Sequence, residues 1–262
     1  MCYDADAAPP PYGPPLTTAT ATDLVLTSAD GTRFDAVLAL PGRSTGTGVL
    51  VLPDNRGLSG FYDQLVVRLA ERGHPALALD YFGGTAGTGH RGRGPEFGQV
   101  ENIMPHLRAL TRQTLYADFD AALAHLRAAG DCRRVVSLGF CMGGRFAFGT
   151  AIPRFGLAGV IGLYGMPDRL HGIPGPTQLA AEFTAPVLGL FGGADEHITP
   201  DVVDAFGAAL AGAGVAHEIV TYPGAPHGFF EAGAAAYVDA QVDAWKRITR
   251  FLDGASPVAA AH

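Results

Sequence analysis

Short apolar runs alternate with amphipathic segments over most of the chain. Five runs after Gly48 are almost continuously apolar, which is typical of strands covered on both faces in a parallel sheet. They are VLVLP (49–53), ALALD (76–80), VVSLGF (135–140), GVIGLY (159–164) and PVLGLFGG (186–193). A sixth strand is expected in HEIVTY (217–222).

Segments with helical spacing of apolar residues lie between these runs. They are residues 61–73, 114–130, 143–152, 199–214 and 234–254. Several end in glycine, which suits the left-handed cap of a helix C-terminus. Strands that alternate with helices predict a doubly wound α/β fold, with a mostly parallel central sheet flanked by helices.

The N-terminal part has a different pattern. Residues 23–31 and 34–40 alternate in polarity around an Asp-Gly turn, which predicts an antiparallel hairpin at the edge of the sheet. Residues 1–21 are rich in Pro, Ala and Thr and are expected to form a tail. We therefore predict a single domain over residues 22–253, with a second tail at 254–262.

Two connections, about 81–110 and 165–184, are long for a compact domain. Long loops without structure of their own often carry function. Ligands of such sheets bind beyond the carboxyl ends of the strands, where both connections would emerge.

Composition and charge exclude several classes of protein. The chain has 262 residues, 48% of them hydrophobic, and a net charge of −7, which argues against nucleic acid or an anionic membrane as partner. The N-terminus lacks the pattern of a secretory signal and there is no membrane-length apolar run, so a cytoplasmic protein is expected. The three cysteines show no zinc or disulfide spacing and are expected to be reduced.

One cysteine lies where a predicted strand passes into a helix. The sequence GFCMGG (139–144) has the form G-x-C-x-G-G, a turn that raises a nucleophile above the sheet edge and needs glycines beside it. The start of the helix favours a thiolate at Cys141. The alternative is ordinary packing, because cysteine is often buried.

A cysteine nucleophile needs a base and a carboxylate that orients the base. In α/β-hydrolases the order along the chain is nucleophile, acid, histidine. Asp195 and His227 follow Cys141 in that order, each just after a predicted strand. Competing candidates are the acids Glu196 and Asp201 and the base His197, and Asp195 alone could be a turn or helix-cap residue.

The oxyanion of the reaction needs two N–H donors. The residue after the nucleophile, Met142, is one candidate, and Asn55, in the loop after the first buried strand, is the other. Asp54 beside it is a carboxylate that could face the thiol, or a residue that makes a local turn.

These residues resemble the dienelactone hydrolase family, the cysteine α/β-hydrolases of the carboxymethylenebutenolidase type. The resemblance covers residues 22–253 and rests on PDNRGL, GFCMGG, GGADEHITP and YPGAPHGFF. It implies an α/β-hydrolase fold, a triad of Cys141, Asp195 and His227, and an oxyanion hole from Asn55 and Met142. The family has a glutamate near the thiol, where this chain has the shorter Asp54.

The resemblance carries over less well to the substrate. Family members that hydrolyse dienelactone hold its carboxylate with two arginines, and the matching positions here are near Gly84 and at Glu231. Arg91 and Arg93 are candidate replacements, although arginines on a Gly-rich loop are more often surface residues. Arg56 and Tyr164 complete the candidate substrate-binding residues.

The sequence thus predicts a hydrolase of carboxylic esters or small enol lactones that works through a thioester acyl-enzyme. An acyltransferase or thioesterase on the same scaffold is an alternative, and a non-catalytic binding or redox-sensing protein is another. We expect no cofactor, no metal, and no nucleotide at the Gly-rich 84–94 segment, which lacks the Gly-Lys-Ser/Thr of a phosphate loop. The expected partner is a small molecule, and the expected state is a monomer or a small homo-oligomer.

Overall fold

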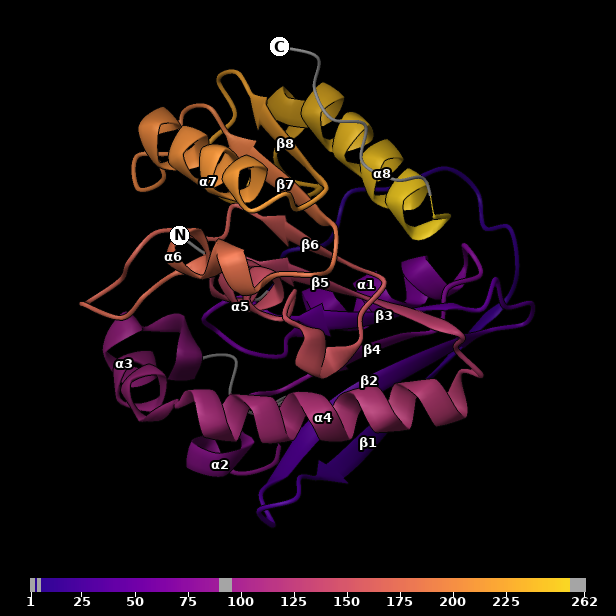
Figure 1. Cartoon of the computed structure of the whole chain (residues 1–262). Helices are drawn as coiled ribbons and strands as arrows, with labels where there is room; N and C mark the ends of the chain where they lie inside the picture. The colour runs from indigo at the N-terminus through magenta and orange to yellow at the C-terminus, as the bar shows by residue number, and fades with distance from the viewer. Residues whose placement is uncertain (1–2, 4–5, 90–95, 255–262) are drawn as a thin grey trace. The chain divides into compact units, whose positions relative to one another are not determined.

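The computed structural model describes residues 3, 6–89 and 96–254, which fall into two compact units (Figure 1). The first unit ends at Val135 and the second begins at Val136. The predicted Arg91 and Arg93 lie outside the described residues, as do Cys2 and the segment after residue 254.

Four strands of the first unit are hydrogen-bonded in the order β1-β2-β4-β3. Their bounds are Ala19–Thr27 (β1), Arg33–Pro41 (β2), Thr47–Leu52 (β3) and Ala76–Leu79 (β4). β1 and β2 form the predicted antiparallel hairpin, β2 is also antiparallel to β4, and β3 and β4 are parallel. Every residue of β3 and β4 is buried, as their continuous apolar sequences predict.

Helices α1 (Gly60–Ala70) and α4 (Arg112–Ala129) pack on these strands (Figure 1). Thr111 caps α4, and its hydroxyl accepts from the N–H of Thr114. The connection over 81–110, expected to be a loop, contains α2 (Gly83–Ala86) and α3 (Val100–Ala109). α3 was missed although Val100, Ile103, Met104 and Leu107 have the spacing of an amphipathic helix; Ile103 is its one buried residue, and Pro105 lies inside the helix.

The second unit contains four strands in the order β5-β6-β7-β8, all parallel to their neighbours. Their bounds are Arg134–Phe140 (β5), Gly159–Leu163 (β6), Val187–Gly192 (β7) and His217–Tyr222 (β8), β5 beginning two residues before the unit boundary. Gly162 is required in β6, because a Cβ there would lie 2.3 Å from the Phe148 ring.

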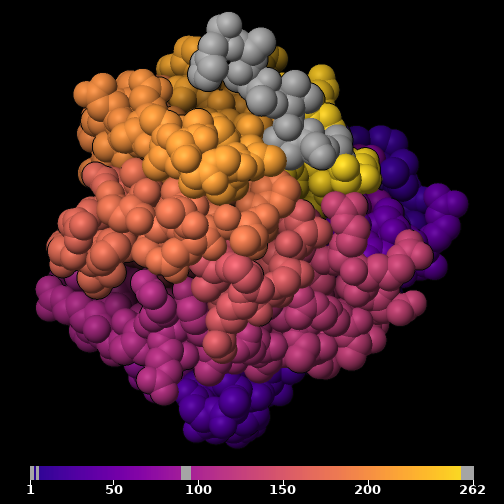
Figure 2. All heavy atoms as spheres, in the orientation of Figure 1, coloured from indigo at the N-terminus to yellow at the C-terminus, as the bar shows by residue number. Residues whose placement is uncertain are grey.

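The helices of the second unit are α5 (Met142–Gly149), α6 (Pro176–Leu179), α7 (Pro200–Gly212) and α8 (Val238–Leu252). α5 packs against β6, and α7 against β8. Figure 2 shows the side chains of α7, in orange, at the surface of the unit. α8 buries one face, with Trp245 only 1% exposed.

The predicted fold class is confirmed: the chain has an α/β-hydrolase fold, with parallel strands, flanking helices and an antiparallel N-terminal pair. Among the described residues, no helix is both long enough and apolar enough to cross a bilayer.

A buried carboxyl group in α4 links that helix to the turn between β1 and β2. Asp118 is only 3% exposed, and its Oδ1 accepts from the Ser28 hydroxyl at 2.7 Å. Burial raises the pKa of Asp118 to about 6; the charges of Asp30 and Asp80 add to the effect, and the Ser28 hydrogen bond opposes it. Folding therefore raises the protonated fraction of Asp118 at pH values between about 4 and 6.

We predict that Asp118→Asn stabilises the protein by an amount that grows with pH. The pKa of Asp118 is higher in the folded than in the unfolded chain, so its favourable contribution is complete below the unfolded value of about 3.9. That contribution is lost as the pH rises through about 6. Urea unfolding of both proteins between pH 4 and 7 measures the difference, and a difference that does not change with pH would contradict the assignment.

Candidate active site

Cys141 occupies the turn between β5 and α5 with an unusual backbone conformation. Its φ is +53° and its ψ −113°, a region that residues with a side chain rarely adopt. The Cys141 N–H donates to Leu163 O at 3.0 Å, and its carbonyl accepts from Arg145 N at 3.1 Å. The turn thus joins the end of β6 to the first turn of α5, and tertiary hydrogen bonds hold the strained residue.

Glycines make this turn possible because backbone segments approach closely on both sides of it. A Cβ on Gly139 would lie 1.9 Å from Gly143 O, and a Cβ on Gly144 would lie 2.8 Å from Leu163 O. Real Cβ atoms do not approach backbone oxygens so closely, and a buried backbone cannot easily move aside. The small residues around Cys141 are therefore dictated by packing.

The turn places Cys141 at the N-terminus of α5. Met142 is the first residue of the helix, so its N–H has no acceptor four residues earlier within the helix. Free N–H groups and the positive end of the helix dipole favour an anion at this point. The site can stabilise a thiolate at Cys141 and a negative oxygen near Met142.

Asp195 and His227 lie together in the same unit. His227 Nδ1 is 2.6 Å from Asp195 Oδ2, and Asp195 Oδ1 accepts from the N–H groups of His197 (2.9 Å) and Ile198 (3.1 Å). The Asp195 side chain is 1% exposed and the His227 side chain 14%. The carboxylate is fixed by three donors and in turn fixes the imidazole.

Charges shift the pKa values of both partners. Burial lowers the pKa of His227, but its hydrogen bonds to Asp195 and Cys141 and the charges of both residues outweigh this effect and raise the pKa to about 9. For Asp195 burial acts to raise the pKa, yet the His227 hydrogen bond and charge hold it below its usual range. The structure therefore brings Cys141, His227 and Asp195 into one interacting group, with an imidazolium at neutral pH.

Tyr164, a candidate for substrate binding, follows β6 and packs on the histidine. Its ring centroid lies 4.9 Å from that of His227 and 5.6 Å from that of Phe229. Its φ is +39°, and its N–H donates to Leu190 O at 2.8 Å. Tyr164 is 1% exposed, so in this conformation it supports the imidazole ring.

Asp54, Asn55 and Arg56 belong to the first unit, in the loop after β3. Asp54 Oδ1 accepts from Arg56 N at 2.8 Å, a local turn of the kind that the sequence left open as an alternative. Asp54 is 2% exposed, and Asn55 Oδ1 is a buried acceptor without a donor among the described residues. The roles of Asp54 and Asn55 toward the thiol stay predictions.

The competing acids and base differ from the interacting group in exposure. Glu196, His197 and Asp201 are exposed, whereas Asp195 is buried. Among the described residues, no group of three or more His, Cys, Asp and Glu side chains is arranged to hold a metal ion.

Arg145 was missed in the sequence and lies four residues after Cys141. Its guanidinium donates to Met166 O at 2.9 Å, to Asp168 O, and to Ile173 O and Pro174 O at 3.4 and 3.3 Å. Burial lowers its pKa. The signal that could have found it is an arginine in a helix that is otherwise small and apolar.

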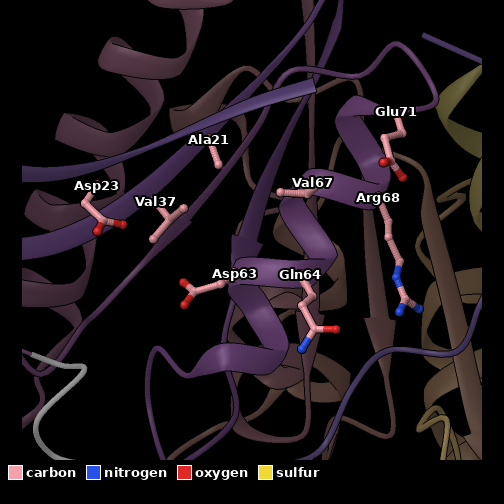
Figure 3. A pocket seen from close by; sticks show the side chains of 8 residues that line it. All are labelled: Ala21, Asp23, Val37, Asp63, Gln64, Val67, Arg68 and Glu71. Carbon is pink, nitrogen blue, oxygen red and sulfur yellow. The ribbon is translucent and has the colours of Figure 1, made fainter. Parts of the chain in front are cut away.

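A surface pocket lies in the first unit, between β1, β2 and α1 (Figure 3). It is lined by Ala21, Asp23, Val37, Asp63, Gln64, Val67, Arg68 and Glu71. None of these is a predicted site residue.

Comparison with sequence families identifies relatives of the whole fold. The model described as "Dienelactone hydrolase family" matches residues 34–256. A Yersinia pestis protein named "Putative carboxymethylenebutenolidase" is 29% identical over 231 residues, 84% of this chain and 83% of its own. A Bradyrhizobium protein named "Probable 2-oxo-3-(5-oxofuran-2-ylidene)propanoate lactonase" is 29% identical over 235 residues, 85% of this chain and 91% of its own.

A solved structure is similar over nearly the same length. The crystal structure of a "Putative Dienelactone Hydrolase" from Klebsiella pneumoniae is 26% identical to this chain and superposes with a TM-score of 0.78. The match covers 90% of this chain and 99% of that one.

We predict that Asp195→Asn lowers the pKa of His227 from about 9, because the Asp195 charge and the hydrogen bond to its carboxylate, which are part of what raises this pKa, are lost, while burial, which lowers it, remains. NMR titration of the imidazole Cε1–H measures this pKa, with His227→Gln identifying the signal. Glu196→Gln, which removes an exposed carboxylate next along the chain, should leave it unchanged. Equal effects of the two variants would show that Asp195 is not the partner.

We also predict that Gly139→Ala destabilises the protein by about 3 kcal/mol or more, because the new methyl group overlaps backbone atoms. Gly149→Ala is a matched control at the other end of α5, where a Cβ meets nothing within 4 Å. It should change the free energy of unfolding by less than about 1 kcal/mol. Urea unfolding compares the two, and a tolerated Gly139→Ala would argue against the close backbone approach.

Proposed function

The chain belongs to the dienelactone hydrolase family, and we propose that it hydrolyses carboxylic esters or small enol lactones through a covalent intermediate on Cys141. The family and its named relatives place the chain among hydrolases. The observation that carries the finer proposal is the hydrogen-bonded group of Cys141, His227 and Asp195. Nucleophile, base and orienting acid are the parts that acyl transfer to a cysteine requires.

In the resting enzyme we assign the proton to the imidazole. A His227 pKa of about 9 means that the ring is protonated at neutral pH, beside the sulfur at the start of α5. Asp195 occupies Nδ1, which leaves Nε2 as the ring nitrogen for Cys141. The thiolate is the reactive form of cysteine, and an imidazolium and a helix N-terminus both stabilise it.

In the first step the thiolate attacks the ester carbonyl, and the carbonyl oxygen becomes negative. The Met142 N–H at the start of α5 is one donor for this oxygen, and the Asn55 N–H is the second that the family resemblance implies. When the C–O bond breaks, His227 Nε2 gives its proton to the leaving oxygen. The product of this step is a thioester on Cys141.

In the second step the neutral imidazole takes a proton from water, and the hydroxide that forms attacks the thioester. The sulfur leaves as thiolate and the proton stays on His227, which restores the resting pair. Asp195 holds the ring orientation through both steps. A thiolate is a good leaving group and can be expelled again from the tetrahedral intermediate of the first step. Esters whose own leaving group is good, such as enolates and phenolates, are therefore favoured over amides.

We further propose that neutral substrates are preferred over those with a free carboxylate. Glu231 and Gly84 stand at the two positions where the family resemblance places arginines, and Glu231 would repel an anion. The predicted cytoplasmic location and the monomeric or small oligomeric state are kept as proposals.

The acyltransferase alternative shares the first step and differs in the acceptor. Alcohols or thiols added to the assay would divert the acyl group if an acceptor other than water is natural. In the redox-sensing alternative, Cys141 is also a reactive thiolate, but the protein does not hydrolyse a substrate.

We predict that Cys141→Ala lowers kcat/KM for p-nitrophenyl acetate by at least about 10³-fold, because the nucleophile is lost. Mass spectrometry of the quenched wild type should detect an acyl group on Cys141. In a panel of esters that includes cis- and trans-dienelactone, the neutral esters should react faster than the two dienelactones, which carry a free carboxylate.

Cys132→Ala is the matched control for the Cys141 variant. Burial raises the pKa of the Cys132 thiol to about 11, so this cysteine stays protonated and should be dispensable. Full activity of Cys141→Ala would remove the proposed mechanism. Turnover absent from the wild type, with a Cys141 thiol that alkylates rapidly at neutral pH, would favour the redox-sensing alternative.

A further inference from the structure

The N-terminal segment, expected from its composition to be a tail, is tied to α1. We define the N-terminal strap as residues 3 and 6–17. Arg68 of α1 donates to the carbonyls of Pro9 and Pro10, and the Arg72 guanidinium lies 4.5 Å from the Tyr12 ring centroid. Figure 3 shows Arg68 and Glu71 projecting from the C-terminal half of the helix.

The far end of the strap is fixed by a pair of backbone hydrogen bonds. The N–H groups of Leu16 and Thr17 both donate to Glu71 O, at 2.9 and 3.1 Å. A proline has no N–H to donate but keeps its carbonyl as an acceptor, and hydrogen bonds from a charged guanidinium are stronger than those between neutral groups. The strap is therefore held along its length by polar contacts as well as by burial of Ala7, Pro9 and Pro10.

Tyr3 brings the start of the strap onto the loop after β3. Its ring stacks on Phe61 with centroids 3.8 Å apart and an angle of 15°, and the residue is 5% exposed. Its N–H donates to Asp54 Oδ2 at 3.2 Å, and its carbonyl accepts from Arg56 Nη1 at 2.6 Å. One residue thus contacts two of the three residues of Asp54–Arg56.

Two buried tyrosines, Tyr62 and Tyr81, form hydrogen bonds with the backbone of the same loop. The Asp54 N–H donates to the Tyr62 hydroxyl oxygen at 2.8 Å, and the Tyr81 hydroxyl donates to the carbonyls of Asp54 and, at 3.1 Å, Pro53. Tyr62 and Tyr81 are buried in the unit. They hold the backbone of the loop, and Tyr3 holds its side chains.

We propose that the N-terminal strap positions the Asp54–Arg56 loop for catalysis, with Tyr3 as a positioning residue. This inference rests on the proposed function, in which Asn55, between the two residues that Tyr3 binds, gives its N–H to the oxyanion. The Tyr3–Asp54 and Tyr3–Arg56 bonds restrain the loop on both sides of Asn55. Stacking on Phe61 fixes the Tyr3 backbone that makes them.

The kinetic test compares Tyr3→Ala with Tyr3→Phe. The alanine variant loses the stacked ring, and we expect kcat for p-nitrophenyl acetate to fall about tenfold with KM changed less than about twofold, because an oxyanion donor acts mainly in the transition state. Tyr3→Phe keeps the ring and should stay within about twofold of wild type. Leu16→Ala, at a strap side chain that is 66% exposed, controls for a general effect of changing the segment.

The structural test is amide hydrogen exchange, which does not depend on turnover. Tyr3→Ala should speed exchange of a peptide covering residues 53–60 about tenfold while the β5–β6 peptides stay protected. Unchanged exchange at 53–60 would overturn the proposal, and so would faster exchange with unchanged kcat.

A double variant separates positioning from a loss of overall stability. In an Asp54→Ala background, Tyr3→Ala should lower kcat by clearly less than tenfold further, because the Tyr3–Asp54 bond is already gone and only the Tyr3–Arg56 bond remains to be weakened. An undiminished tenfold loss in that background would contradict the route through Asp54. If the wild type shows no Cys141-dependent hydrolysis, the proposed function fails by itself, and the exchange result alone decides whether the strap holds the loop.

Discussion

The close approach of backbone at the β5–α5 turn is the constraint on which the candidate site depends. A strand that turns into a helix over one residue leaves room for no Cβ at Gly139 or Gly144, and it forces Cys141 to a positive φ. The cost of that conformation is offset by the bond from Cys141 N to Leu163 O and by the first turn of α5. The position of the thiol at the helix N-terminus and its charge preference follow from this geometry.

Sequence patterns predicted the fold well because its strands are buried on both faces and its glycines are required by packing. β3, β4 and β5 to β7 carry continuous apolar runs, and within three residues of the end of each strand comes a side chain that can carry chemistry: Asp54, Asp80, Cys141, Tyr164 and Asp195. The order of Cys141, Asp195 and His227 along the chain could be read for the same reason. Which carboxylate bonds to His227 could not be read from the sequence, because Glu196 and Asp201 carry the same chemical group as Asp195. In the structure Asp195 is buried and the other two are exposed.

Other features gave weaker signals. The apolar residues of α3 have helical spacing, but the helix buries only Ile103 and contains Pro105, so the segment could be taken for a loop. The segment around Pro9 and Pro10 forms no helix or strand, yet it packs through its carbonyl groups and through the ring of Tyr3. A composition rich in proline excludes regular structure, but it does not exclude a fixed conformation.

The Arg145 guanidinium donates hydrogen bonds to four main-chain carbonyl oxygens of the segment that follows β6. Every residue has such an oxygen, whatever its side chain. The path of residues 166–174 beside α5 is thus fixed by contacts that do not involve their side chains. Substitutions within residues 166–174 can therefore change the surface that this segment presents to a ligand. They leave the main-chain hydrogen bonds that attach the segment to α5 in place. A lysine at position 145 could not replace these bonds, because its compact ammonium group lacks the planar, five-donor geometry of the guanidinium.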